Sequence, residues 1–148
     1  MKIAIGADHR GFLFKEMLKK NKHIANCAIE WIDFGASTNE PSDYPVFVAP
    51  VCKALQAQQV QKGILICGSG VGMSIAANRF AGIYAALVWN EDVARVSCQD
   101  DNANVLVLPA DFISADRVVA IIAAWLCAQF KKGKYQHRLA MVDAFGGV

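Results

Sequence analysis

The sequence predicts an α/β protein: a three-layer α/β/α sandwich with a five-stranded parallel sheet of the Rossmann-like, doubly wound kind, plus a C-terminal helical tail. Two observations support this fold class. Short apolar runs alternate with amphipathic helical segments along the whole chain, and no hairpin signal joins any two of the strands. With 148 residues the chain can build one full core, so we expect a single domain over residues 1–148.

The strands are expected where short apolar segments run into glycine, proline or polar residues. They cover residues 2–7, 28–34, 64–66, 84–88 and 105–108. The helices are expected where apolar residues recur every three or four positions, with polar residues on the opposite face. They cover about 11–20, a segment from 45, a segment after 70, a segment from 90, a long segment from 114 to about 131–133, and about 136–145.

Start signals support three of these helices. Pro45 lies in the first turn of its helix, and Ser42 and Asp43 just before it are typical capping residues. Asn90 is followed by two acidic residues, and Ser114 opens the long helix. In a parallel sheet of this kind, every loop that follows a strand lies at the same edge, where such folds bind ligands.

Composition excludes several classes of protein. Charged residues are 19% of the chain, the net charge is +2 and the lysines are scattered, so no nucleic-acid partner is expected. No apolar run approaches the ~18 residues of a membrane span, and no basic leader precedes the first strand. The five cysteines lack metal-ligand spacing, so we expect a reduced, cytoplasmic protein without metal or cofactor. A mean hydropathy of +0.29 favours a homo-oligomer, because one small domain would leave apolar surface exposed.

The stretch GILICGSGVGMSIAANRF, residues 63–80, carries the main functional signal. A buried strand ends at Cys67, and Gly68, Gly70 and Gly72 follow before a helix resumes. Such a turn leaves backbone N–H groups free to bind a phosphate, a carboxylate or an oxyanion. It lacks the Lys–Ser/Thr pair of a Walker loop and the spacing of a dinucleotide fingerprint, so we expect an anion other than a nucleotide. The alternative is that the glycines only allow tight helix–sheet packing.

Three side chains at the predicted edge can carry chemistry. Cys67 lies before a helix start that would favour its thiolate, so it is a candidate nucleophile or proton-transfer base, or else an ordinary buried cysteine. Asp8 and His9 follow the first strand and pair a carboxylate with an imidazole that titrates near neutral pH. The alternatives are that Asp8 caps a helix and that His9 is a surface residue.

Five segments resemble the ribose-5-phosphate isomerase B family, which also contains the galactose-6-phosphate isomerase subunits. They are GADHRGF at 6–12, SDYP at 42–45, GILICGSGVGMSIAANRFAGI at 63–83, NANVLVL at 102–108 and AQFKKGKYQHR at 128–138. The resemblance covers nearly the whole chain. It implies an aldose–ketose isomerase of the pentose phosphate pathway that interconverts ribose 5-phosphate and ribulose 5-phosphate through an enediolate, without a metal.

The resemblance also implies roles for individual residues. Cys67 would be the base that moves a proton between C1 and C2, while Asp8 and His9 would bind substrate hydroxyls. The residues expected to hold the enediolate oxygens are Gly68, Ser69, Gly70, Val71 and Gly72. Lys134, where the family has an arginine, and Arg138 would reach the phosphate of a neighbouring subunit, in a homodimer or tetramer with a shared active site.

Two acidic residues depart from the family pattern. Asp100 stands where the family usually has its ring-opening histidine, and it could act as the acid only if burial or the neighbouring Asp101, itself expected to bind substrate, raised its pKa. Asp111 stands where an arginine often meets the phosphate, which a carboxylate would repel. Arg10 and His137 are candidates to compensate. The alternatives are isomerisation of another sugar, such as galactose 6-phosphate, allose 6-phosphate or an unphosphorylated sugar, and a non-catalytic module that binds a sugar phosphate.

Overall fold

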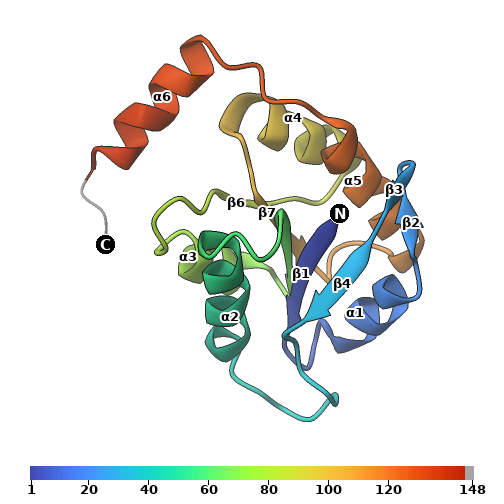
Figure 1. Cartoon of the computed structure of the whole chain (residues 1–148). Coiled ribbons are helices and arrows are strands. Elements are labelled where there is room, and N and C mark those ends of the chain that lie inside the picture. Colours follow the sequence, from blue (N-terminus) through green and yellow to red (C-terminus); the bar gives the residue numbers. More distant parts are fainter. Residues whose placement is uncertain (146–148) are drawn as a thin grey trace.

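The computed structural model describes residues 1–145 and contains a five-stranded parallel sheet with helices on both faces (Figure 1). The elements are β1 Lys2–Ala7, α1 Phe12–Lys19, β2 His23–Ile24, β3 Cys27–Ala28, β4 Glu30–Asp33, α2 Pro45–Gln56, β5 Lys62–Cys67, α3 Val71–Ala77, β6 Ala85–Leu87, α4 Glu91–Asp101, β7 Val105–Pro109, α5 Ala115–Cys127 and α6 Lys134–Asp143. The predicted fold class and the C-terminal helix are confirmed. Within residues 1–145, no helix has the length and apolar character needed to cross a membrane.

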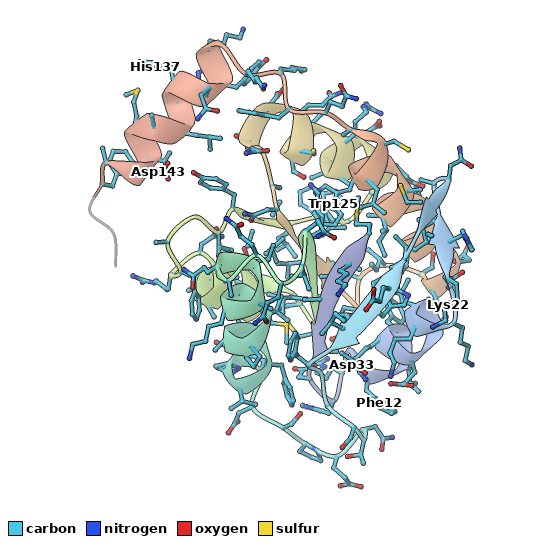
Figure 2. All side chains as sticks on the ribbon, viewed as in Figure 1. Phe12, Lys22, Asp33, Trp125, His137 and Asp143 are labelled. Carbon is cyan, nitrogen blue, oxygen red and sulfur yellow. The ribbon has the colours of Figure 1, made fainter. Side chains whose placement is uncertain are left out.

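Successive residues of each strand face opposite sides of the sheet, which divides the core in two. In β5, Ile64 and Ile66 pack under α1, α4 and α5, whereas Leu65 and Cys67 pack under α2 and α3. Trp125 of α5 is fully buried in the first half, where its indole N–H donates to the carbonyl of Ala103 at 3.0 Å (Figure 2). Because both faces are covered, the strands read in the sequence as continuous apolar runs.

The strand order β4-β1-β5-β7-β6 places the loops of interest side by side. After β1 the next strand of the main sheet, β4, is added on the outer side of β1. After β5 the next strands, β6 and β7, are added on the opposite side of the sheet. The loops that follow β1 and β5 therefore part at this point and leave a crevice between them, as in other doubly wound sheets. The β1–α1 loop and the glycine loop of the candidate site meet there.

The absence of hairpins was a wrong prediction. β2 and β3 form an antiparallel hairpin between α1 and β4, so Ala28 belongs to it and the second strand of the main sheet begins at Glu30. The turn is made by Ala25 and Asn26, which have φ angles of 51° and 62°. Two residues with positive φ match the twist of a tight hairpin, and this turn achieves it without the glycine that usually signals one.

Two predicted helix ends are also wrong. α5 ends at Cys127 rather than near residues 131–133, and Gly133, with a φ of 57°, instead precedes α6. α2 has no side-chain cap at its start, because the position before Pro45 is Tyr44. The predicted cap residue Ser42 uses its hydroxyl elsewhere, as an acceptor for the backbone of His9.

Candidate active site

The glycine loop folds back on the side chain of Cys67. The thiol is only 6% exposed, and the N–H of Gly70 points at its sulfur at 3.2 Å. Gly70 has a φ of 76°, a left-handed conformation that glycine adopts without strain. The N–H of Val71 donates to the hydroxyl of Ser69 at 3.3 Å. The loop therefore directs two of its N–H groups at its own side chains, and one of them favours a thiolate.

The pKa of Cys67 is nevertheless raised above its ordinary value. Burial raises it most, and the nearby carboxylate of Asp8 raises it further. The backbone N–H groups of Gly70 and Met73 and the charge of Arg10 lower it, but by less. The lowering that the sequence predicts is thus present and is outweighed by burial, so the resting protein holds a neutral thiol near pH 7.

Asp8 does not cap α1, whose N-cap position is Gly11 without a side-chain cap, and its binding of a substrate hydroxyl stays a prediction. Its side chain is 5% exposed, and Oδ1 accepts the N–H groups of Arg10 at 2.9 Å and Gly11 at 3.1 Å, so it closes the turn before α1. Within residues 1–145, Oδ2 has no hydrogen-bond partner and is free to accept one from a ligand. The charge of this carboxylate raises the pKa of the Cys67 thiol.

His9 is held by Ser42, a residue that the sequence offered only as a helix cap. The N–H of Ser42 donates to Nδ1 of His9 at 3.2 Å, and the N–H of His9 donates to the Ser42 hydroxyl at 3.1 Å. Because Nδ1 accepts, a neutral His9 carries its proton on Nε2, which can donate to a ligand. His9 is therefore a positioned, partly buried side chain rather than a free surface residue.

Tyr44 covers the far end of the glycine loop, and sequence reasoning missed it as a site residue. A Cβ on Gly72 would lie 2.7 Å from Tyr44 Cζ and 2.9 Å from its hydroxyl. Gly72 is thus needed because a phenol approaches the backbone closely. The signal that could have found Tyr44 was its position after β4, since loops after parallel strands share one edge.

The acidic residues of the predicted site lie at the end of α4. Asp100 accepts a hydrogen bond from Nζ of Lys131 at 2.7 Å. Partial burial raises the pKa of Asp101, as does the charge of Asp100, while Arg138 lowers it. Asp101 therefore holds its proton more strongly than an ordinary aspartate does.

The tail cations gather around one aromatic ring. Lys131, Lys134 and Arg138 lie 5.2, 5.2 and 5.6 Å from the centre of the Tyr135 ring. Lys131 was not among the predicted site residues. Lys131 is already paired with Asp100, so Lys134 and Arg138 are the two of these cations without an ion pair within residues 1–145, and their charge suits the predicted phosphate.

These acidic and basic residues do not meet Cys67 within one chain. α4 starts beside the glycine-loop edge and runs back along the sheet, so Asp100 and Asp101 lie near the start of β7 while Cys67 pairs with its last residue, Pro109. The five residues of β7 span about 16 Å. In Figure 1, β4 points to the lower edge of the sheet, whereas α6 lies at the top. The structure thus places the predicted site residues in two separate groups, called half-sites below: one around Cys67, and one at Asp100, Asp101 and the tail.

Comparisons with known proteins find relatives that match nearly the whole chain. The family model described as Ribose/Galactose Isomerase matches residues 3–142. The ribose-5-phosphate isomerase B of Escherichia coli K12 is 39% identical over 143 residues, which cover 97% of this chain and 95% of that protein. The type B ribose 5-phosphate isomerase of Trypanosoma brucei has a TM-score of 0.93 at 34% identity, with 98% of each chain covered. The Mycoplasma genitalium ribose-5-phosphate isomerase B with bound ribulose-5-phosphate has a TM-score of 0.85 at 35% identity, covering 97% of this chain and 95% of that one. This chain therefore belongs to the ribose/galactose isomerase family, and it is an enzyme of the aldose–ketose isomerase class.

Proposed function

We propose that this chain interconverts ribose 5-phosphate and ribulose 5-phosphate through an enediolate, with Cys67 as the base. The observation that carries the proposal is the glycine loop, whose Gly70 N–H points at the sulfur of Cys67, a thiol that also feels the charge of Asp8. The names of the E. coli relative and of the Mycoplasma structure with ribulose-5-phosphate support the choice of sugar.

The proposed chemistry is a proton transfer between neighbouring carbons. The Cys67 thiolate removes the proton from C2 of the open-chain aldose, and the electron pair moves to O1 to form the enediolate. The same sulfur returns the proton to C1 while the proton on O2 passes to O1, so that O1 becomes a hydroxyl and C2 becomes the ketose carbonyl. His9 Nε2–H donates to a substrate oxygen, and Asp8 Oδ2 accepts from a hydroxyl. Pre-aimed donors of this kind stabilise a developing oxyanion by several kcal/mol.

The loop backbone has a role that changes during the reaction. Gly70 N–H faces sulfur in the resting state, where it favours the thiolate. When sulfur takes the proton from C2 it becomes neutral, while negative charge develops on the substrate oxygens. We assign those oxygens to the exposed Ser69 hydroxyl and to the N–H groups of the loop, residues 68–72.

The ring-opening acid is assigned to the pair Asp100 and Asp101. Lys131 holds Asp100 as a hydrogen-bonded carboxylate, whereas the pKa of Asp101 is raised. Turnover of cyclic ribose 5-phosphate by Asp100→Asn and by Asp101→Asn decides which carboxyl group supplies the proton. The variant with the larger loss identifies the acid, and no loss in either variant would remove this role from the pair.

A homodimer with a shared site accounts for the separation of the half-sites. The phosphate would bind Lys134 and Arg138 of one copy while its sugar carbons lie at Cys67 of the other. A groove of about 390 Å³ runs along edge strand β6 and α4, where Val96 is 41% exposed, and Val142 of α6 is 52% exposed. Apolar surface at a sheet edge is suited to burial against a second copy.

The first test is turnover of ribose 5-phosphate with direct detection of ribulose 5-phosphate. Cys67→Ala should abolish turnover and leave binding of ribose 5-phosphate nearly intact, whereas loss of both would remove its role as base. Cys52→Ala is the matched control, because Cys52 is also a free, buried cysteine and it packs in the same half of the core. Activity only on galactose 6-phosphate, allose 6-phosphate or free ribose would change the substrate, and no activity on any sugar would favour a binding module.

Mixing two inactive variants tests the shared site. One copy carries Cys67→Ala and the other carries Lys134→Ala with Arg138→Ala. A randomly assembled heterodimer has one intact site, so the mixture should recover about a quarter of wild-type activity at substrate concentrations below KM. No recovery, or a monomer by sedimentation at micromolar concentration, would contradict a site made by two copies.

A further inference from the structure

Arg10 and Asp111 form an ion pair against the glycine loop. Arg10 follows β1 and Asp111 follows β7, and Nη2 of the arginine donates to Oδ2 of the aspartate. A Cβ on Gly68 would lie 2.7 Å from Cζ and from Nε of Arg10, and 2.7 Å from Oδ2 of Asp111. The pair therefore packs directly on Gly68 and bridges the two strands on either side of β5.

Main-chain hydrogen bonds fix both partners relative to the site. The N–H of Arg10 donates to Asp8 Oδ1 at 2.9 Å. The N–H of Asp111 donates to the carbonyl of Gly68 at 3.0 Å, and the preceding residue donates to the carbonyl of Cys67 at 2.9 Å. Each charged residue is thus tied to the backbone or carboxylate of a residue in the half-site that holds the thiol.

The ion pair offsets the repulsion that Asp111 alone would exert on a phosphate. The charge of Asp111 is neutralised by Arg10, which keeps unused donors. A guanidinium has five N–H groups, and within residues 1–145 only Asp111 accepts from this side chain. The Arg10 side chain is 57% exposed, so its remaining donors face solvent. An ion pair this exposed contributes little to stability, so replacing either partner should leave the fold intact.

The position of the pair indicates which part of a substrate it meets. Cys67 faces the α2 and α3 side of the sheet, and the next residue of an alternating strand, Gly68, faces the opposite side, where Arg10 packs. The carbons that exchange a proton must lie at the sulfur. A group that reaches Arg10 across the loop is therefore at the other end of the sugar, and in a pentose 5-phosphate that group is the phosphate.

We propose that Arg10, aimed by Asp111, binds the substrate phosphate from the same subunit that supplies Cys67 and selects for phosphorylated sugars. Asp111 is a positioning residue: it holds one edge of the guanidinium fork and leaves the other edge for two phosphate oxygens. The inference rests on the proposed function only in taking the substrate to be a sugar phosphate.

Steady-state kinetics of Arg10→Ala test this assignment. A lost charge-assisted hydrogen bond to the phosphate should raise KM for ribose 5-phosphate by about tenfold or more, with kcat little changed. Arg10→Lys should recover part of the loss, because it keeps the charge without the fork. Asp111→Asn should also raise KM. A lower KM in Asp111→Asn would mean that the carboxylate only repels the substrate, and it would overturn the positioning role.

Arg117→Ala is the matched control. Arg117 pairs with Glu91 at the starts of α5 and α4, with side chains 54% and 33% exposed, against 57% and 35% for Arg10 and Asp111. Its loss removes the same charge from the same edge of the sheet without touching the glycine loop, so KM should not change. Equal KM values for Arg10→Ala and wild type would refute the inference.

Calorimetric titration with inorganic phosphate separates this inference from the proposed function. Phosphate affinity should fall about tenfold in Arg10→Ala and stay unchanged in Arg117→Ala, whether or not the wild-type protein turns over ribose 5-phosphate. An inactive wild-type protein with this pattern would reject the proposed function alone. Active wild type with unchanged phosphate affinity and KM in Arg10→Ala would reject the role of Arg10 alone.

Discussion

Replacing Gly11 with alanine tests how closely α1 approaches β5. Gly11 has a φ of −88° and a ψ of −7°, which alanine adopts readily. The restriction of the unfolded chain alone would stabilise the variant by about 0.4–1 kcal/mol. The new methyl, however, would lie 2.3 Å from the carbonyl oxygen of Ile66 and 2.7 Å from its carbonyl carbon. These are main-chain atoms of a central strand, so they cannot move away from the methyl group as the end of a flexible side chain could.

The steric effect should exceed the entropic one. Overpacking by one methyl costs about 1–3 kcal/mol, so we expect a net loss of about 1–2 kcal/mol in the free energy of unfolding. The start of α1 must move by about 1 Å to restore ordinary contact. Gly11 N–H is bonded to Asp8, so the movement also carries Asp8 and His9 away from Cys67. A shift of about 1 Å in positioned groups can cost ~100-fold, so kcat/KM should fall by about 10- to 100-fold.

Urea denaturation gives the free energy of unfolding, and steady-state kinetics give kcat/KM. Gly82→Ala is the control: Gly82 has a φ of 74°, and no atom lies within 4 Å of the position that a Cβ would take, so only the backbone conformation resists the change. It should cost about 1–2 kcal/mol and leave kcat/KM unchanged. A Gly11→Ala variant as stable and as active as wild type would refute the close approach of α1 to β5.

Three further predictions follow from charges and hydrogen bonds. Burial raises the pKa of Cys67, so kcat/KM should increase with pH above neutrality, and a flat profile from about pH 7 to 9 would contradict a thiolate base. The Tyr84 hydroxyl donates to the Asp143 carboxylate at 3.0 and 2.9 Å, so Tyr84→Phe should speed hydrogen exchange in α6 while the sheet amides keep their rates (Figure 2). Burial raises the pKa of Asp33, but hydrogen bonds from Lys15 and Lys19 outweigh burial and lower the pKa overall. The stability that ionised Asp33 contributes is present above about pH 4 and is lost as pH falls through its folded-state pKa. Lys15→Met should therefore lower the free energy of unfolding, measured by urea denaturation, by less below about pH 4 than at neutral pH.

The strands of the main sheet could be predicted because their signal is local. In β5, four successive apolar residues from Ile64 to Cys67 serve both halves of the core, and a glycine follows at once. The hairpin could not be predicted in the same way, because Ala25 and Asn26 adopt positive φ and the turn contains no glycine, the residue that usually indicates such a turn. Its two strands have two residues each, too few for a periodic pattern.

The candidate site was predictable as far as chain order determines it. Cys67, Asp8 and His9 could be grouped because loops after parallel strands share an edge, whatever the order of the strands. The pairing of Arg10 with Asp111 could not be predicted from the sequence. The two residues are 101 positions apart and meet only because β1 and β7 both flank β5. Strand order is a property of the folded sheet, and the sequence alone left it open.

The proposed division of the site between two copies fits the raised pKa of Cys67 in a single chain. Its thiol is buried and feels the charge of Asp8, and Arg10, the cation that lowers its pKa, is already paired with Asp111. A thiolate formed there would add a second negative charge to a poorly solvated crevice. The tail of a second copy would bring a cluster of cations to this edge, and the substrate phosphate would occupy them together with Arg10. The base would then reach its charged form most easily when both subunits are in place, which confines proton transfer to the assembled, substrate-loaded site.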